Sequence, residues 1–306
     1  PPLAMQLAKI APGIDIRTGG GDINNLRSAD VLIISPGVSL DHPTVRKAQD
    51  IGIEIVGDIE LFARAVAAPV IGITGSNGKS TVTTIVAEMT RLAGLKTYVG
   101  GNIGIPALDL LSDSTPDLYV LELSSFQLET TYSLNAHASV VLNVSPDHMD
   151  RYSSLKDYAN TKKRIYSGQG LMVLNKDEEY IHSIIDSKRD TIYFSLGAPE
   201  GENFGLINHN NEVWLSQGNE KIINKNQLKI KGEHNISNAL AAMALAGAVN
   251  VPTNIMADVL KSFIKELSQN DPFQSVAKEI PLITKLIQTG YTGRKGKGGF
   301  YKMNKK

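Results

Sequence analysis

The sequence contains no cysteine, which excludes disulfide bridges and metal sites built on thiolates. A bound metal ion would need carboxylates, imidazoles, hydroxyls or a bound phosphate as ligands, and this donor set favours magnesium. Long apolar runs are also missing. The most apolar stretch, residues 239–249, is much shorter than the roughly 18 residues of a membrane-crossing helix. We therefore expect neither a membrane span nor a membrane partner.

The chain carries no net charge, since 31 lysine and arginine residues balance 31 aspartate and glutamate residues. Proteins that coat nucleic acid need clustered positive charge, so we expect no nucleic-acid partner. Residues 285–306 depart from this balance, because they include lysine and arginine but no acidic residue. A nucleic-acid or acidic surface is a minor alternative for this stretch, because no series of aromatic residues for base stacking accompanies the charge.

No signal peptide and no initiator methionine open the chain, which begins Pro1-Pro2-Leu3. We expect the chain to start inside a longer protein, and we expect that protein to be cytoplasmic. The 306 residues are enough for two ordinary domains. A content of 42% hydrophobic and 20% charged residues is typical of a soluble globular protein.

Residues 1–68 predict a small, partial α/β piece of the Rossmann-like type. A short apolar strand at 31–34 ends in Ser35-Pro36-Gly37, which is a loop signal. A helical pattern, a strand and a second helix follow at 42–51, 54–56 and about 58–66. Pro69 precedes the next strand, and we place a domain boundary there.

Residues 69–267 alternate between strands and helices. Apolar runs predict strands at 70–73, 118–123, 139–144, 171–174 and 191–194, and helical patterns lie at 79–95, 178–187, 235–249 and 253–267. Residues 203–230 alternate between glycine or asparagine turns and short runs, as in a hairpin or meander. Continuous apolar strands are typical of a sheet covered on both faces. We predict an α/β fold with a mostly parallel sheet and helices on both faces, whose ligands bind at the carboxyl ends of the strands.

The strongest local motif is Gly72-Ile73-Thr74-Gly75-Ser76-Asn77-Gly78-Lys79-Ser80-Thr81. Glycines let backbone N–H groups converge on phosphate oxygens, and the helix that follows adds its positive N-terminal end. In a P-loop, Lys79 supplies charge to the outer phosphates and Ser80 a magnesium ligand. The general pattern has a glycine where Ile73 stands, so the support comes from the apolar strand before the motif and the long helix after it. A structural turn is the alternative.

Two further motifs lie within or after apolar strands. Glu122 interrupts the strand at 118–123, and a lone buried carboxylate is costly unless it is paired or binds a metal. It is either a satisfied structural glutamate or the magnesium partner of the P-loop. His148 follows the strand at 139–144. A single histidine is more often a surface residue, but at the sheet edge of a P-loop it is a candidate ligand of a second metal.

Two other segments have ordinary explanations on local grounds. Lys162-Lys163-Arg164 lies on a predicted helix, where a run of charge is usually a solvated face. The segment from Gly232 to Asn238 opens a helix with two asparagines, Asn235 and Asn238. Their amides can cap the helix or contact the edge of a base, and the local sequence alone favours the cap.

Taken together, these segments resemble the Mur ligase family, and within it the branch that adds D-glutamate. The matches follow the family in order and approximate spacing, at residues 75–81, 100–104, 121–131, 147–152 and 234–238. The run Ser124-Ser125-Phe126-Gln127-Leu128-Glu129 distinguishes this branch from relatives that add L-alanine, diamino acids or dipeptides. The same run argues against the related ligase that adds glutamate to folate. The resemblance covers about residues 25–263.

The resemblance implies an ATP-dependent amide-bond ligase of peptidoglycan synthesis that works as a monomer. ATP would phosphorylate the L-alanine carboxylate of UDP-N-acetylmuramoyl-L-alanine, and the amine of D-glutamate would then displace the phosphate. Such chemistry depends mostly on positioning and on control of charge. The implied ATP-binding residues are those of the P-loop, Gly75, Ser76, Asn77, Gly78, Lys79, Ser80 and Thr81, with Asn235 and Asn238 at the adenine.

The resemblance also implies two magnesium ions and the remaining site residues. Ser80 and Glu122 would hold the first ion and His148 the second. Lys162 matches the lysine that the family carbamylates, which turns a cation into a carboxylate-like group that supports the second metal. Lys163, next in sequence, leaves this register open by one residue. Asn102 and Ser124 would face the nucleotide substrate, and the implied catalytic residues are Lys79, Glu122, His148 and Lys162.

Both ends of the chain differ from the family. The strand and glycine-rich loop that open the family's first domain have no match, and neither has the third domain that holds D-glutamate. From residue 268 the tail instead resembles the end of 3-hydroxyacyl-CoA dehydrogenases, but it lacks the cofactor site of those enzymes. A spliced or misassembled reading frame would produce such a change of sequence. The alternative function is therefore an inactive remnant that binds ATP and magnesium but lacks the groups that position D-glutamate.

Overall fold

The computed structural model of the chain describes residues 26–111, 114–182 and 189–266, together with the isolated positions 9, 11 and 13. The basic tail predicted from residue 268 onward lies outside these residues. So does the last part of the helix predicted at 178–187, of which the structure describes α8 (Glu179–His182).

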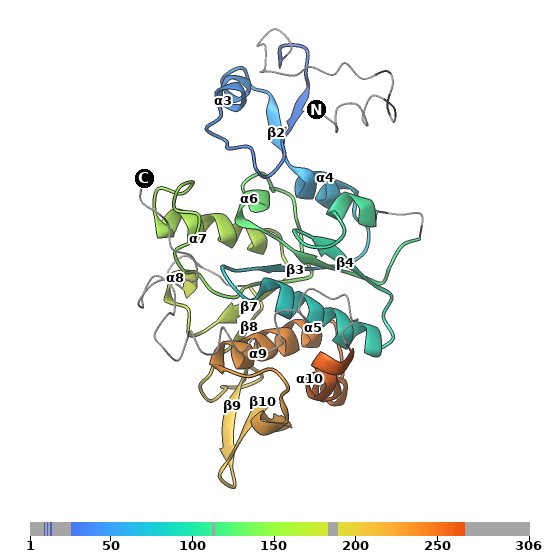
Figure 1. Ribbon diagram of the computed structural model, residues 1–306, viewed down its shortest axis with the longest axis vertical. Helices are drawn as coiled ribbons and strands as arrows, with labels where there is room; N and C mark the ends of the chain where they lie inside the picture. Colours follow the sequence, from blue (N-terminus) through green and yellow to red (C-terminus); the bar gives the residue numbers. More distant parts are fainter. Residues whose placement is uncertain are drawn as a thin grey trace, which may run out of the picture.

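An N-terminal lobe, residues 26–57, stands at the top of the molecule in Figure 1. Its strands β1 (Val31–Ile33) and β2 (Glu54–Val56) pair in parallel, and α3 (Pro43–Asp50) connects them. Helix α3 begins at a proline, which has no N–H to leave unpaired, and the His42 side chain accepts a hydrogen bond from Thr44 N. The lobe has a small core of its own, made by Leu26, Ile34, Val45, Ala48 and Ile55.

Helix α4 (Asp58–Ala65) links this lobe to the central body. Its side chains Ile59 and Phe62 are fully buried in an apolar cluster that also contains residues of the central strands. The Phe62 ring meets the Tyr119 ring edge-on, with 5.2 Å between the ring centroids. The helix precedes Pro69 and yet packs on the central body, and the domain boundary that we place at Pro69 stays a prediction.

The central body is built on one nine-stranded sheet within the described residues, in the order β11-β10-β9-β8-β7-β6-β3-β5-β4. Every neighbouring pair from β4 to β9 is parallel, and β9, β10 and β11 form an antiparallel meander at one edge. The predicted α/β fold with a mostly parallel sheet is confirmed. The strands are β3 (Val70–Thr74), β4 (Thr97–Gly101), β5 (Leu118–Glu122), β6 (Ala138–Val141), β7 (Leu171–Asn175), β8 (Thr191–Phe194), β9 (Phe204–His209), β10 (Glu212–Gln217) and β11 (Glu220–Asn224).

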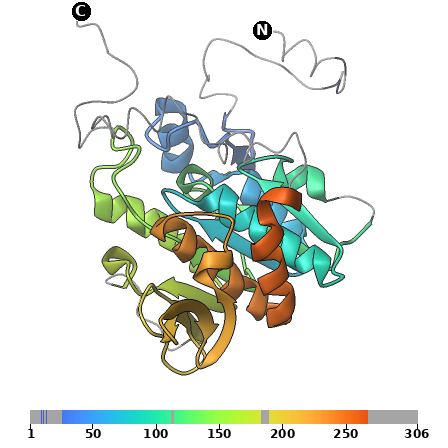
Figure 2. The same cartoon turned by 60° about the horizontal axis from the view of Figure 1, so that its bottom comes forward.

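Helices cover both faces of this sheet. On one face, α5 (Lys79–Leu92), α9 (Glu233–Ala248) and α10 (Thr253–Glu266) pack apolar residues against the strands. Figure 2 shows α9 and α10, in orange and red, together on this face. The other face carries α4, α6 (Ser125–Leu128), α7 (Leu155–Lys163) and α8 around a second apolar cluster. Single turns of 3-10 helix lie at Ala107–Leu110, Arg164–Tyr166 and Lys225–Gln227.

Strand β4 is the one element of the central sheet that the sequence pattern does not predict. Two glycines at its end, Gly100 and Gly101, weaken the strand pattern. At Gly101 φ is +105°, and a Cβ would lie 2.3 Å from the Glu122 carbonyl oxygen, so glycine lets β4 close against β5.

Helix α5 ends at Leu92 rather than at residue 95, because Gly94 turns the chain with φ +93°. None of the described helices is long and apolar enough to cross a membrane.

Candidate active site

The P-loop, residues 75–78, joins β3 to α5 at the carboxyl edge of the sheet. Gly78 has a φ of +81°, and a Cβ at this position would lie 2.4 Å from Oδ1 of Asn238. Asn238 comes from α9, so the approach of this helix leaves room only for a glycine in the loop. Asn238, one of the two residues predicted to contact the adenine, therefore packs against the P-loop.

Two residues of the segment that follows β6 brace the P-loop. Asn143 accepts a hydrogen bond from Asn77 N at 2.9 Å through Oδ1, and its Nδ2 donates to the Asn77 carbonyl oxygen at 3.0 Å. The N–H of Ser145 donates to Ser76 Oγ at 3.0 Å. The sequence pattern places this segment at the sheet edge but assigns Asn143 and Ser145 no role. Both residues come just after β6, which lies next to β3. That position in the sequence could have predicted their contact with the P-loop.

Glu122 ends β5, the other neighbour of β3, and it is 2% exposed. Its Oε2 accepts a hydrogen bond from Ser80 Oγ at 2.8 Å, and its Oε1 accepts one from Asn102 Nδ2 at 3.1 Å. Three candidate site residues from α5, β5 and the end of β4 therefore meet at one point. Both hydrogen-bond donors are neutral side chains, so a cation bound beside this buried carboxylate would supply the compensating charge.

The donors at this point suit magnesium, which prefers hard oxygen ligands and keeps water or phosphate oxygens in its shell. Among the described residues, no three histidine, aspartate or glutamate side chains converge to form a metal site. A metal would therefore have to combine the Glu122 carboxylate with the Ser80 hydroxyl and the phosphates of a bound nucleotide. That mixed ligand set is the one expected beside a P-loop.

Two lysines donate hydrogen bonds to the P-loop, Lys79 from the start of α5 and Lys162 from α7. Lys79 Nζ donates to the carbonyl oxygens of Gly75 (2.9 Å) and Ser76 (3.2 Å), and Lys162 Nζ donates to the same Gly75 oxygen at 2.9 Å. Lys162 is 1% exposed, whereas Lys163 is exposed to solvent. The structure thus brings the first lysine of the charged run, and not the second, to the site.

The environment of Lys162 favours the neutral form of its amine. Burial, and to a lesser extent the positive charge of Lys79, lower the pKa of Lys162 to about 7, against an opposing effect of Asp147. Its Nζ also lies 4.3 Å from the centroid of the Tyr158 ring. A lysine with such a pKa is largely neutral just above neutral pH, and a neutral amine is a nucleophile.

The remaining candidate residues lie around this centre. His148 has a φ of +54°, its side chain is 45% exposed, and it is not among the residues that line the P-loop pocket. Ser124 caps α6, since its Oγ accepts a hydrogen bond from Gln127 N at 3.2 Å. Asn235 Nδ2 donates to the Lys231 carbonyl oxygen at 2.8 Å. The metal, substrate and adenine roles of these residues stay predictions.

A pocket of about 630 Å³ opens at the P-loop and is large enough for a small-molecule ligand. Glu122 and Asn102 line it together with the P-loop residues. The sequence analysis assigns no site role to several other lining residues, although two of them, Ile103 and Gly104, lie in the matched segment 100–104. Among these residues, Thr83 has a buried hydroxyl without a hydrogen-bond partner in the structure. These additional residues are Thr83, Thr84, Val99, Ile103 and Gly104.

The fold agrees with comparisons to known proteins. Residues 73–246 match the Mur ligase middle domain, and residues 1–57 match the MurD-like N-terminal domain of Mur ligases. The chain therefore belongs to the Mur ligase family.

Two bacterial relatives carry the same name, UDP-N-acetylmuramoylalanine–D-glutamate ligase. The one from Nitrosococcus oceani is 49% identical over 86% of this chain and 58% of its own length. The one from Escherichia coli is 46% identical over 84% of this chain and 58% of its own length. The chain thus spans a little over half the length of these curated relatives.

Solved structures of other Mur ligases share the fold. The UDP-N-acetylmuramate:L-alanyl-gamma-D-glutamyl-meso-diaminopimelate ligase of Neisseria meningitides has a TM-score of 0.58 at 20% identity, covering 86% of this chain and 87% of its own. A UDP-N-acetylmuramoyl-L-alanyl-D-glutamate–2,6-diaminopimelate ligase has a TM-score of 0.56 at 17% identity, covering 84% of this chain and 66% of its own. At such low identity these likenesses support the fold alone.

The contact between Gly78 and Asn238 gives a matched test of the P-loop. Gly78→Ala should lower the affinity for magnesium-ATP at least tenfold, because the new Cβ displaces the loop from Asn238. Gly94→Ala is the control, since its φ of +93° is equally unfavourable for alanine but nothing lies within 4 Å of the new Cβ. We expect the positive φ to cost each variant roughly 1–2 kcal/mol of stability, and the clash with Asn238 to add to the loss in Gly78→Ala. Affinity is measured by titration calorimetry. Equal affinity in the two variants would contradict the assignment.

Proposed function

We propose that this chain supplies the ATP and magnesium site of a ligase that adds D-glutamate to UDP-N-acetylmuramoyl-L-alanine in peptidoglycan synthesis. The observation that carries the proposal is the buried Glu122 carboxylate bonded to Ser80 at the mouth of a P-loop. The relative from Nitrosococcus oceani, 49% identical to this chain, is named for that reaction. The buried carboxylate supports the binding of magnesium and ATP, and the likeness to the named relative supports the choice of substrates.

In this proposal the P-loop backbone and Lys79 bind the outer phosphates of ATP, and Ser80 with Glu122 would hold the first magnesium ion. When bound, that ion neutralises charge on the transferred phosphoryl group. Lys79 Nζ lies on carbonyl oxygens of its own loop, from which it can turn to a phosphate. Asn238, packed on Gly78, and Asn235 are placed at the adenine.

The proposed reaction has two steps. The L-alanine carboxylate attacks the γ-phosphorus of ATP, the bond to the leaving ADP breaks, and an acyl phosphate forms. The amine of D-glutamate then attacks the acyl carbon, loses a proton, and expels inorganic phosphate as the amide forms. Asn102 and Ser124 are proposed to contact the nucleotide substrate, and His148 to hold the second magnesium ion. Positioning of the reacting groups supplies much of the rate enhancement in such chemistry.

We also propose that Lys162 is carbamylated. Its amine is buried behind Gly75 with a pKa of about 7, so a substantial neutral fraction is available to attack carbon dioxide. The N–C bond that forms releases a proton and leaves a carboxylate-like group, which would support the second magnesium ion. We further propose that the protein acts as a monomer in the cytoplasm.

Phosphate release tests the function. The proposal predicts that the protein releases phosphate from magnesium-ATP only with UDP-N-acetylmuramoyl-L-alanine. In a ligase that also contains the domain that holds D-glutamate, D-glutamate but not L-glutamate should yield an amide seen by mass spectrometry. Lys79→Ala should reduce this release at least about 100-fold, because a charge that stabilises the transition state is lost. Lys96→Ala, at an exposed position, should leave it unchanged. Binding of ATP without substrate-dependent phosphate release would contradict the proposal and favour an inactive ATP-binding chain.

Carbamylation of Lys162 predicts a defined pH dependence. In protein equilibrated with carbon-13 bicarbonate, a carbamate signal should grow as the pH rises through about 7 and fall below it, because protonation removes the nucleophilic amine. Lys162→Arg should lose the signal and Lys163→Arg should keep it. Lys162→Ala should regain part of its activity when short carboxylates are added. Loss of the signal in the Lys163 variant would show that the register is wrong, and absence of any signal would contradict carbamylation.

A further inference from the structure

Arg151 extends from the loop after β6 to the N-terminal lobe. Its side chain is 13% exposed. Nη2 donates to the Val38 carbonyl oxygen at 3.1 Å and Nη1 donates to the Gly37 carbonyl oxygen at 3.4 Å. Both carbonyls belong to the loop that follows β1. Because a guanidinium group stays charged in proteins, these are charge-assisted contacts from the central body to the lobe.

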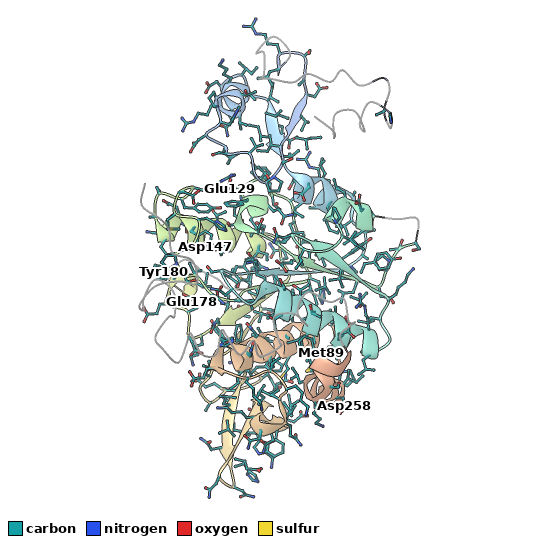
Figure 3. All side chains as sticks on the ribbon, viewed as in Figure 1. Met89, Glu129, Asp147, Glu178, Tyr180 and Asp258 are labelled. Atoms are coloured by element: carbon teal, nitrogen blue, oxygen red, sulfur yellow. The ribbon has the colours of Figure 1, made fainter. Side chains whose placement is uncertain are left out.

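The same guanidinium group is fixed by the central body. Its Nε donates to Glu129 Oε1 at 3.1 Å and its Nη2 donates to Oε2 at 2.5 Å, in a two-pronged pair with a carboxylate that is 10% exposed. Its Cζ lies 4.6 Å from the centroid of the Phe126 ring. Phe126 lies in α6 and Glu129 caps its C-terminal end. Glu129, labelled in Figure 3, lies where the lobe meets the central body.

The Phe126 ring connects this contact to His148. The centroids of the two rings are 4.7 Å apart, and the backbone N–H of Arg151 donates to the His148 carbonyl oxygen at 2.9 Å. The residue that contacts the lobe therefore also fixes the short loop that carries His148 and the ring against which the imidazole lies.

Polar contacts matter here because the lobe is not part of the apolar clusters of the central sheet. Its core, built around Val45 and Ile55, is separate from the two clusters on the faces of the central sheet. Burial of apolar surface has no direction, whereas the fork of an arginine fixes both the distance and the angle of its partners. The orientation of the lobe therefore depends on directional contacts such as those of Arg151.

We propose that Arg151 is a positioning residue that docks the N-terminal lobe on the central body and orients His148. The docking of the lobe by Arg151 is inferred from the contacts alone. That the orientation of His148 matters for the second magnesium ion rests on the proposed function. A lysine should not replace Arg151, because one ammonium group cannot form the fork with Glu129, contact two carbonyls of the lobe and stack on Phe126 together.

Distances between spin labels test the docking. Because the chain has no cysteine, single labels can be introduced by Gln49→Cys on α3 and Asn160→Cys on α7, both at exposed positions. We expect a narrow distance distribution that broadens in Arg151→Lys and in Glu129→Gln. The control, Arg164→Lys, should leave the distribution narrow. Arg164 also stacks on a ring, 4.7 Å from the Tyr132 centroid, and donates to a backbone carbonyl, but its contacts lie within the central body.

Thermal unfolding by circular dichroism shows that each variant is folded before its distances are compared, and Glu129→Gln keeps the test decisive if an Arg151 variant unfolds. Unchanged distributions in both folded Arg151→Lys and Glu129→Gln would overturn the docking. This measurement needs no substrate, so it stands even if the proposed ligase activity is not found.

The orientation of His148 has its own readout. Near an aromatic ring 4.7 Å away, the imidazole protons of His148 should have ring-shifted NMR resonances, identified by their loss in His148→Gln. In Arg151→Lys these resonances should move toward the shifts of a free histidine, and in Arg164→Lys they should stay. A change in stability alone would not move them. Resonances that stay in place in folded Arg151→Lys would overturn the positioning role.

Discussion

The hydrogen bond from Ser80 Oγ to Glu122 Oε2, 2.8 Å long, is the interaction on which the site depends. It joins the first turn of α5 to the end of β5, so it forms only because β5 lies next to β3 in the sheet. It also leaves a buried carboxylate with neutral hydrogen-bond donors on both oxygens. A buried carboxylate of this kind is costly without a compensating partner, and the partner that we propose is a magnesium ion shared with a nucleotide.

One loop, residues 143–152, connects this centre to the rest of the molecule. Asn143 and Ser145 at its start brace the P-loop. Arg151 near its end bonds the N-terminal lobe and Glu129. His148 lies between them. Because a single short loop contacts both the phosphate site and the lobe, movement of the lobe and the geometry of the site are expected to be coupled.

The structural features that depend on local sequence are predicted well. The P-loop is predicted from its glycines together with the apolar strand before it and the long helix after it. The other strands follow from hydrophobic runs, and the mostly parallel sheet is confirmed. Strand β4 is not predicted because its two glycines weaken the strand pattern. The structural reason for Gly101 is the close approach of β5, which the local sequence of β4 does not reveal. The charged run does not distinguish Lys162 from Lys163, and the family resemblance points to Lys162 but leaves the register open by one residue. The structure shows that Lys162 is the buried one, which depends on how α7 packs. The contacts of Arg151 join segments more than 100 residues apart, and no local pattern signals them.

The central claim is that Glu122 holds a magnesium ion beside bound ATP. The most direct measurement is the affinity for a non-hydrolysable ATP analogue at increasing magnesium concentration, in the unaltered protein and in Glu122→Gln. Glu88→Gln on the outer side of α5 serves as the control. We expect magnesium to raise the affinity of the unaltered protein and of the control about tenfold or more, and to raise that of Glu122→Gln only slightly. An undiminished magnesium effect in Glu122→Gln would contradict the account.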